Sequence, residues 1–407
     1  DGCMENVFIK YEEALSILDA HSDPFPEEER PLHSCIGAYL VEDLHADRDF
    51  PPFDRVTMDG ISLSYEAFAN GQREFSIEDI APAGTPKKTL QNSQNCIEVM
   101  TGAIMPGNTD TVIRYEDLEI TNGKAKVLSA LVSQGQNIHF KGIDRTSGSV
   151  IVRKGKQLSS AELNIAAAVG KPMLRVKKMP GAVIISTGDE LVDVHQTPEL
   201  HQIRRSNIYG IQSTLKTWGV PADLRHLPDD KEQMLEIISG LLKEYDLFIF
   251  TGGVSKGKFD YLPDVLETLQ IEKHFHKIQQ RPGKPFWFGT SKEGKKIFAL
   301  PGNPVSSFVC VYVYLRFWLY KSLGLDITPL YVSLKNDVNF KPNLVYFLEA
   351  KLESNPDGTL QADPISGNGS GDFANLVETD GFLVLPQNKS EFKQGEVYLF
   401  VPYRDIF

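Results

Sequence analysis

From about Met179, apolar runs of strand length alternate with helical patterns for roughly 150 residues. The strand-like runs are continuous stretches of Val, Ile and Phe, which are typical of strands buried on both faces of a parallel sheet. This alternation predicts a parallel α/β domain. The expected strands are Ala182–Ser186, Asp223–Leu227, Leu247–Phe250 and Ile297–Leu300, and the expected helices are Asn207–Thr217, Lys231–Lys243, Tyr261–Leu269 and Val305–Leu319.

The rest of the 407 residues follows other patterns, and a chain of this length is expected to form several domains. Residues 7–20 and 159–169 have helical periodicity, and Ser159 or Ser160 is a suitable N-cap for the second helix. Short β-rich runs separated by Gly, Pro and Asn turns lie between these helices, and similar runs follow Pro329. We therefore expect a multidomain α/β and β protein. Its domains would be a helical domain of residues 4–48 and 148–175, an inserted mostly-β module of residues 49–147, the α/β domain of residues 176–328, and a small β-barrel-like domain of residues 329–407.

Composition excludes several classes of protein. The formal charge of −12 disfavours binding to nucleic acid, and no apolar run approaches the roughly 20 residues that span a bilayer. The first residues lack a basic segment followed by an apolar one, so we expect no secretory signal. The four cysteines form no CxxC pair, which favours a reduced cytoplasmic chain without structural zinc.

Polar turn sequences follow each expected strand of the α/β domain. They are TGDE (187–190), PDD (228–230), TGGVS (251–255) and PGNP (301–304). One such run is ordinarily a simple turn. In open α/β sheets, however, ligands bind beyond the carboxyl ends of the strands, so four runs at one edge predict a binding site there.

The third run has the features of an anion site. Gly252 and Gly253 let backbone N–H groups approach a ligand. The N-terminal end of the helix expected after this loop favours negative charge. Further candidates in this loop are Ser255 for its hydroxyl, Lys256 and Lys258 for their charge, and Asp260 as the N-cap of the next helix. The spacing matches neither a P-loop nor the dinucleotide-binding GxGxxG. The loop therefore predicts an anionic, phosphate-bearing small molecule.

A second basic run comprises Lys277 and the segment Arg281-Pro282-Gly283-Lys284-Pro285. Its prolines fix the direction of the charges, although a solvated turn with surface lysines is the alternative. The carboxylates expected near these cations are Glu190, Asp229, Asp230 and Asp260. Carboxylates beside a phosphate ligand suit Mg²⁺, but Asp230 and Asp260 can equally act as helix caps.

These runs together resemble the MoeA family, the molybdopterin molybdotransferases of molybdenum cofactor biosynthesis. The matching stretches are PPFDRVTMDG (51–60), MTGAIMPGNTDTVI (100–113), STGDEL (186–191), FTGGVSKGKFDYL (250–262), QRPGKPFWFG (280–289) and ALPGNPVSSF (299–308). They occur in the family's order along most of the chain. A single such motif also occurs in related pterin-binding domains, whereas the combination with the MDG and MTGA loops is specific.

The resemblance implies a transferase that inserts molybdate into adenylylated molybdopterin and releases AMP, with Mg²⁺ as cofactor. It also implies a homodimer whose active cleft is completed by the partner's β module, and a molybdopterin adenylyltransferase as pathway partner. By motif, the catalytic candidates are Asp59, Glu190, Asp229 and Asp260, of which Glu190, Asp229 and Asp260 are also the metal candidates. The binding candidates are Thr101, Asp144, Gly252, Gly253, Ser255, Lys256, Lys258, Lys277, Arg281, Lys284, Pro301, Pro304 and Ser370.

The chain departs from the family pattern at two positions. Arg281 stands where some members have Lys, which keeps the charge and adds a bidentate donor. The stretch Asn343–Phe347 lacks an arginine that the pattern would place there. Two alternatives remain: a related pterin or nucleotide enzyme, of the adenylyltransferase or deamidase type, and a non-catalytic scaffold. Both are disfavoured, the first because its members lack the β module and the C-terminal domain, the second because the scaffolds carry a fused partner domain.

Overall fold

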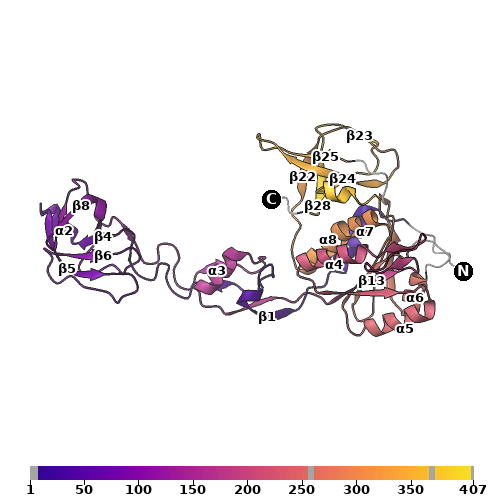
Figure 1. The fold of residues 1–407 in the computed structure, drawn as a ribbon, viewed down its shortest axis with the longest axis horizontal. Helices are drawn as coiled ribbons and strands as arrows, with labels where there is room; N and C mark the ends of the chain where they lie inside the picture. The colour runs from indigo at the N-terminus through magenta and orange to yellow at the C-terminus, as the bar shows by residue number, and fades with distance from the viewer. Residues whose placement is uncertain (1–7, 255–260, 366–371, 405–407) are drawn as a thin grey trace. The chain divides into compact units, whose positions relative to one another are not determined.

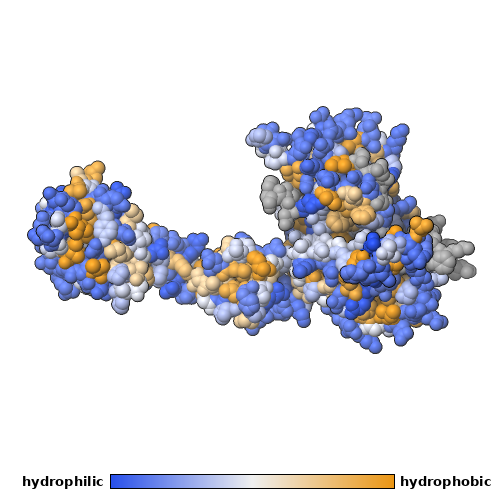
Figure 2. Space-filling model, in the orientation of Figure 1, coloured by the Kyte–Doolittle hydropathy of each residue, from blue (hydrophilic) through white to orange (hydrophobic). Residues whose placement is uncertain are grey.

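The structure is a computed structural model, and it describes residues 8–254, 261–365 and 372–404 (Figure 1). The chain forms two compact units. One is Glu29–Val176, and the other combines Asp1–Glu28 with Lys177–Phe407. Within the described ranges, no helix is both long enough and apolar enough to cross a membrane. In the space-filling view, hydrophilic residues cover most of the visible surface, and apolar residues gather in patches such as the one over α3 (Ser160–Ala168) (Figure 2).

The α/β domain of the second unit is built on a sheet with the strand order β16-β13-β17-β21-β20-β18. The first four strands run parallel, as predicted, and β20 and β18 extend the sheet with antiparallel pairing. The strand bounds are β16 Ala222–Leu227, β13 Ala182–Thr187, β17 Leu247–Thr251, β21 Lys296–Leu300, β20 Pro285–Thr290 and β18 Glu272–Lys277. The short strands β14 (Leu191–Val192) and β15 (Ile203–Arg204) pair beside it.

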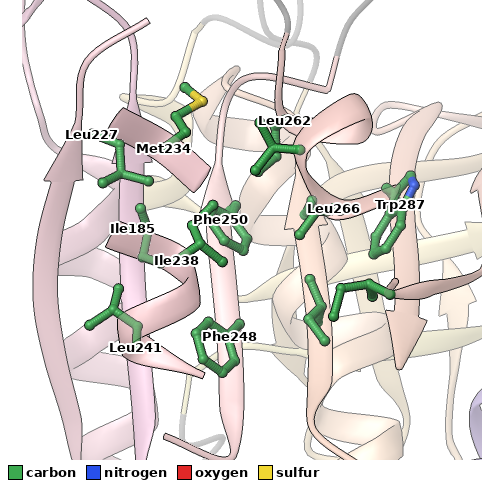
Figure 3. Packing of buried hydrophobic residues seen from close by; sticks show 14 of the residues in the cluster. Ile185, Leu227, Met234, Ile238, Leu241, Phe248, Phe250, Leu262, Leu266 and Trp287 are labelled. Atoms are coloured by element: carbon green, nitrogen blue, oxygen red, sulfur yellow. The ribbon is translucent and has the colours of Figure 1, made fainter. Parts of the chain in front are cut away.

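Helices cover both faces of this sheet (Figure 1). On one face, α5 (Lys231–Leu241) and α6 (Leu262–Thr268) bury apolar side chains against the strands, and Figure 3 shows Phe248 and Phe250 of β17 among them. The other face carries α4 (Asn207–Thr217), α7 (Pro304–Cys310), the π-helical turn η3 (Val311–Leu315) and α8 (Arg316–Ser322), and α8 packs against α1 (Tyr11–Ala20). The parallel strands are therefore buried on both sides, which explains their continuous apolar sequences.

The C-terminal region forms a closed small barrel. Its strands follow the order β24-β25-β22-β28-β26, and β24 also pairs with β26, which closes the sheet. The short strand β19 (Gln280–Arg281) of the α/β region pairs in parallel with β24. The elements of this region are β22 Leu330–Leu334, β23 Val338–Asn339, β24 Val345–Ser354, β25 Leu360–Pro364, α9 Asn375–Glu378, β26 Gly381–Leu385, β27 Glu391–Phe392 and β28 Val397–Pro402.

The unit of Glu29–Val176 contains a sheet with the strand order β7-β4-β6-β5-β9-β8. The helix α3 in this unit begins with a capping box, in which Ser159 and Glu162 bond each other's backbone N–H groups. Ser159 is thus the N-cap. The remaining elements are β1 Glu27–Pro31, η1 Leu32–Ser34, β2 Leu44–His45, β3 Arg55–Val56, β4 Gly60–Leu63, α2 Tyr65–Ala69, β5 Glu74–Ala81, β6 Cys96–Val99, β7 Thr111–Arg114, η2 Tyr115–Asp117, β8 Leu118–Thr121, β9 Lys124–Val127, β10 Ile138–His139, β11 Val150–Val152 and β12 Met173–Lys177.

Candidate functional site

The ends of three neighbouring strands meet at the glycine run after β17. Gly252 and Gly253 have φ angles of 91° and 71°, in the left-handed region that favours glycine. A Cβ atom on Gly253 would lie 2.8 Å from Thr187 Oγ1 at the end of β13, and the N–H of Gly252 donates to Leu300 O of β21 at 3.1 Å. The two glycines are therefore required by close packing between strand ends, in addition to any ligand.

The buried side-chain amide of Gln280 anchors the basic loop of residues 281–285 after β18. Gln280 Nε2 donates to the carbonyl oxygens of Pro282 and Gly283, both at 3.0 Å, while Oε1 accepts from the hydroxyl of Tyr314. Gly283 has a φ of 86°, and a Cβ there would lie 2.8 Å from Gln280 Nε2. These contacts fix the backbone of the loop, while the side chains of Arg281 and Lys284 stay exposed.

A cavity of about 610 Å³ lies between this loop and three other segments. Its walls are the glycine run after β17, the Pro301–Asn303 turn after β21, the basic loop, and residues 344–349 at the start of β24. Arg281 and Lys284 line it and supply positive charge. The cavity therefore suits an anion, and one wall comes from the C-terminal barrel.

A second cavity of about 390 Å³ adjoins the first, because Gly252, Gly302 and Asn303 line both. Glu190, Pro304 and the segment Arg204–Ile208 line this second cavity. Asn207 Nδ2 donates to Gly302 O at 2.8 Å and so ties the start of α4 to the turn after β21. The two cavities form one continuous polar region at the carboxyl edge of the sheet.

Several buried polar atoms at the second cavity lack a partner. Thr187 Oγ1, Arg205 Nε and Asn303 Oδ1 are buried without a hydrogen bond within the described residues. Arg205 also forms an ion pair with Asp193 at 2.5 Å. Buried polar atoms without partners are costly, so their presence at one cavity indicates that a ligand or water completes their hydrogen bonds.

The acidic residues of the sheet edge have different surroundings. Asp229 and Asp189 bond each other's backbone N–H groups, at 3.1 and 3.3 Å, which links the ends of β16 and β13. Asp230 accepts from the N–H of Gln233 and caps α5, so its predicted capping role is confirmed. Glu190 instead lines the second cavity.

Lys284 of the first cavity and Lys277 both lie over the ring of Phe8, with Nζ 4.4 and 5.4 Å from its centre. Lys277 belongs to β18, so the two basic positions that the sequence singled out come from separate segments and share one aromatic contact.

In the unit of Glu29–Val176, Asp59 and Thr101 are joined directly. Asp59 Oδ1 accepts from the N–H and the hydroxyl of Thr101, at 2.6 and 2.7 Å. These hydrogen bonds lower the pKa of Asp59, because they favour its charged form. Asp144 Oδ2 lies 2.8 Å from Nε2 of His139, which fixes that carboxylate in turn. The structure therefore pairs the motif residues Asp59 and Thr101 and gives Asp144 a histidine partner that the sequence did not suggest.

Five sequence candidates lie outside the described residues, namely Ser255, Lys256, Lys258, Asp260 and Ser370. Over the part of the chain that is described, no group of three or more His, Cys, Asp or Glu side chains is arranged to hold a metal ion. Asp229 and Glu190 are therefore metal candidates that would need ligand oxygens to complete a site, as Mg²⁺ often does with phosphates.

Sequence reasoning missed two parts of the site. The first is Arg204, Arg205 and Asn207, although a basic pair directly before a predicted helix is a recognisable anion signal. The second is Glu349, which the strand pairing of the C-terminal barrel brings to the first cavity. No sequence pattern pointed to Glu349, because its position at the cavity depends on the pairing of β24 with β19 of the α/β region.

Comparison with known proteins agrees with this geometry. Residues 183–321 match the family model described as a probable molybdopterin binding domain. Residues 9–170 match the MoeA N-terminal region (domain I and II), and residues 331–403 match the MoeA C-terminal region (domain IV). The match thus extends through both units.

Relatives of known sequence and structure extend this similarity along the whole chain. The molybdopterin molybdenumtransferase of Synechocystis sp. is 41% identical over 390 residues, which cover 95% of this chain and 98% of the relative. That of Staphylococcus epidermidis is 28% identical over 90% of this chain and 88% of its own. A solved molybdopterin biosynthesis MoeA protein from Pyrococcus horikoshii superposes with a TM-score of 0.81 at 27% identity, over 98% of this chain and all of that one. The chain belongs to the MoeA family, so the resemblance found in the sequence is confirmed.

Proposed function

We propose that this chain inserts molybdate into adenylylated molybdopterin and releases AMP. It is a transferase of molybdenum cofactor biosynthesis, as its family membership shows. The observation that carries the specific reaction is the pair of adjoining cavities that share Gly252 and Gly302, one lined by Arg281 and the other by Arg204 and Arg205. The reaction brings together two anions, an oxyanion and a phosphate anhydride, and two adjacent basic cavities suit that requirement.

The larger cavity is proposed to receive the oxyanion, because Arg281 and Lys284 both line it. The smaller one is proposed to receive the phosphate anhydride, because Arg204 and Arg205 line it together with the start of α4, although Arg205 is also paired with Asp193. Gly252 between them permits close approach of both ligands to the backbone. The loop candidates Ser255, Lys256, Lys258 and Asp260 remain proposals for the same region.

Mg²⁺ is proposed to bind with the phosphate, held by Asp229 and Glu190, with Asp260 as a further candidate. When bound, the ion would neutralise charge on the departing AMP. The chain's own cations hold the anions in place and, as fixed donors, stabilise charge that develops on the leaving phosphate. Pro301 and Pro304 are proposed to shape the turn between the cavities, and Ser370 to contribute from the C-terminal domain.

The remaining motif residues are proposed to act across a homodimer. Asp59, Thr101 and Asp144 belong to the other compact unit, and we propose that a second copy of the chain supplies them to the cleft. The four-domain division, with boundaries near residues 48, 147, 175 and 328, is proposed on the same basis. Cys35, Cys96 and Cys310 are buried and form no disulfide within the described residues, which supports the proposal of a cytoplasmic setting. A molybdopterin adenylyltransferase would supply the substrate there.

The test is molybdate-dependent release of AMP from adenylylated molybdopterin. Asp229→Asn and Asp59→Asn are each expected to abolish it while circular dichroism stays unchanged. Matched controls are Asp264→Asn and Asp79→Asn, since both carboxylates are exposed and each forms an ion pair with a surface lysine. Full activity in both site variants would reject the proposed reaction, and a monomeric mass in light scattering would reject the shared cleft.

A further inference from the structure

Glu349 is a buried carboxyl group at the wall of the larger cavity. It is 8% exposed, and its Oε1 is buried without a hydrogen-bond partner among the residues that the structure describes. Its neighbours in β24, Leu348 and Ala350, point into the barrel core, so strand alternation directs Glu349 to the opposite face. A buried carboxyl without a partner is costly and calls for a functional explanation.

The side chains around Glu349 do not neutralise it. Burial and the charge of Asp372 raise the pKa of Glu349 to about 7. Within the described ranges no cation forms an ion pair with it, although Arg281 and Lys284 line the same cavity. An anion that entered this cavity would therefore meet both cations and a carboxyl group that can be neutral or charged near pH 7.

The other elements packed against β24 add few charges that face Glu349. On β25, Asp363 is already paired with Lys335, and β26 has no titratable side chain. The helix α9 also packs against β24, and its one acidic residue, Glu378, is exposed. The hydroxyls of Tyr346 and Tyr403 have raised pKa values, for which burial is the main cause and Glu349 a further one. Both tyrosines are neutral near pH 7, so among these three groups Glu349 is the one that changes charge near that pH.

We propose that Glu349 takes up a proton when an oxyanion occupies the cavity beside Arg281 and Lys284. The ionised carboxylate would repel the anion, whereas the neutral acid can donate its O–H to an anion oxygen. Oxyanion affinity then falls as pH rises through 7. This proposal rests on the proposed function for the identity of the anion, and it adds a residue that makes binding depend on pH.

The test uses molybdate itself as the probe, with isothermal titration calorimetry on the full-length protein at pH 6.5 and 8.0. Titration in two buffers with different ionisation enthalpies measures the protons taken up. For the wild type we expect an affinity loss of about tenfold between these pH values and an uptake approaching one proton at pH 8.0. Glu349→Gln should bind at pH 8.0 about as tightly as the wild type does at pH 6.5, with no proton uptake.

Two control variants separate the role of Glu349 from general effects. Glu378→Gln, which alters an exposed carboxylate on α9, should keep the wild-type pH dependence. Glu349→Asp retains an ionisable group and should keep proton uptake. If Glu349→Gln fails to fold, the wild-type proton uptake alone decides, and its absence overturns the proposal.

The remaining outcomes distinguish this proposal from the proposed function. Molybdate binding that does not depend on pH, in a wild type that still releases AMP, would overturn the role of Glu349 and leave the reaction intact. Persistent pH dependence in Glu349→Gln would also overturn it. A wild type that neither binds molybdate nor releases AMP would overturn both.

Discussion

The amide of Gln280 should be the main anchor of the basic loop. Gln280→Met keeps the side-chain length but removes the donors to the carbonyl oxygens of Pro282 and Gly283 and the acceptor for Tyr314. Gly283 and Tyr314 are buried, so at least two polar groups would lose their partner without access to water. Each such group costs about 1–3 kcal/mol, so we expect a loss of about 2–6 kcal/mol in the free energy of unfolding.

Urea denaturation followed by tryptophan fluorescence measures this loss, because Trp287 and Trp318 are buried in the same unit. Gln233→Met, on the exposed face of α5, is the matched control and should change little. Tyr314→Phe should be less than additive with Gln280→Met, since both remove one hydrogen bond. A loss below about 1 kcal/mol for Gln280→Met, or full additivity, would refute the view that this amide holds the loop.

Three further predictions follow from single contacts. Gly253→Ala should lower the melting temperature and the molybdate affinity more than Gly294→Ala. Both glycines have positive φ, but of the two new Cβ atoms only the one at residue 253 meets Thr187, at 2.8 Å. Equal effects of the two substitutions would reject the packing argument. Ser159→Ala should cost about 1 kcal/mol in urea denaturation by removing the N-cap of α3, and an unchanged midpoint would contradict the capping role. Burial raises the pKa of Glu349 from 4.5 to about 7, so the folded protein holds this proton more tightly than the unfolded chain does. The resulting stabilisation is fully present below pH 4.5 and is lost as pH rises through about 7. Glu349→Gln should therefore abolish a pH-dependent loss of up to about 3 kcal/mol in the free energy of unfolding between pH 5 and 8. Parallel stability curves for the two proteins would count against that last prediction.

The sequence predicted the elements whose apolar periodicity and end signals lie within their own residues. The helix Asn207–Thr217 was predicted with the bounds that the structure shows, because its apolar periodicity is regular and Gly219 follows its end. The antiparallel strands β18 and β20 were missed, since Pro282, Gly283 and Pro285 make the segment that joins them look like an extended turn. The pairing of these strands depends on β21, which lies later in the chain.

Local sequence patterns specify the alternation of strands and helices, and they place the glycine run and the basic and acidic side chains at the strand ends. Those features follow from periodicity, steric limits and the parallel direction of neighbouring strands. Three other features come from tertiary contacts alone: Gln280 holds the basic loop, the edge divides into two cavities that share Gly252, and Glu349 reaches one of them. The physical reason is that β19 pairs with β24, residues more than 60 positions apart, and no local pattern encodes that contact.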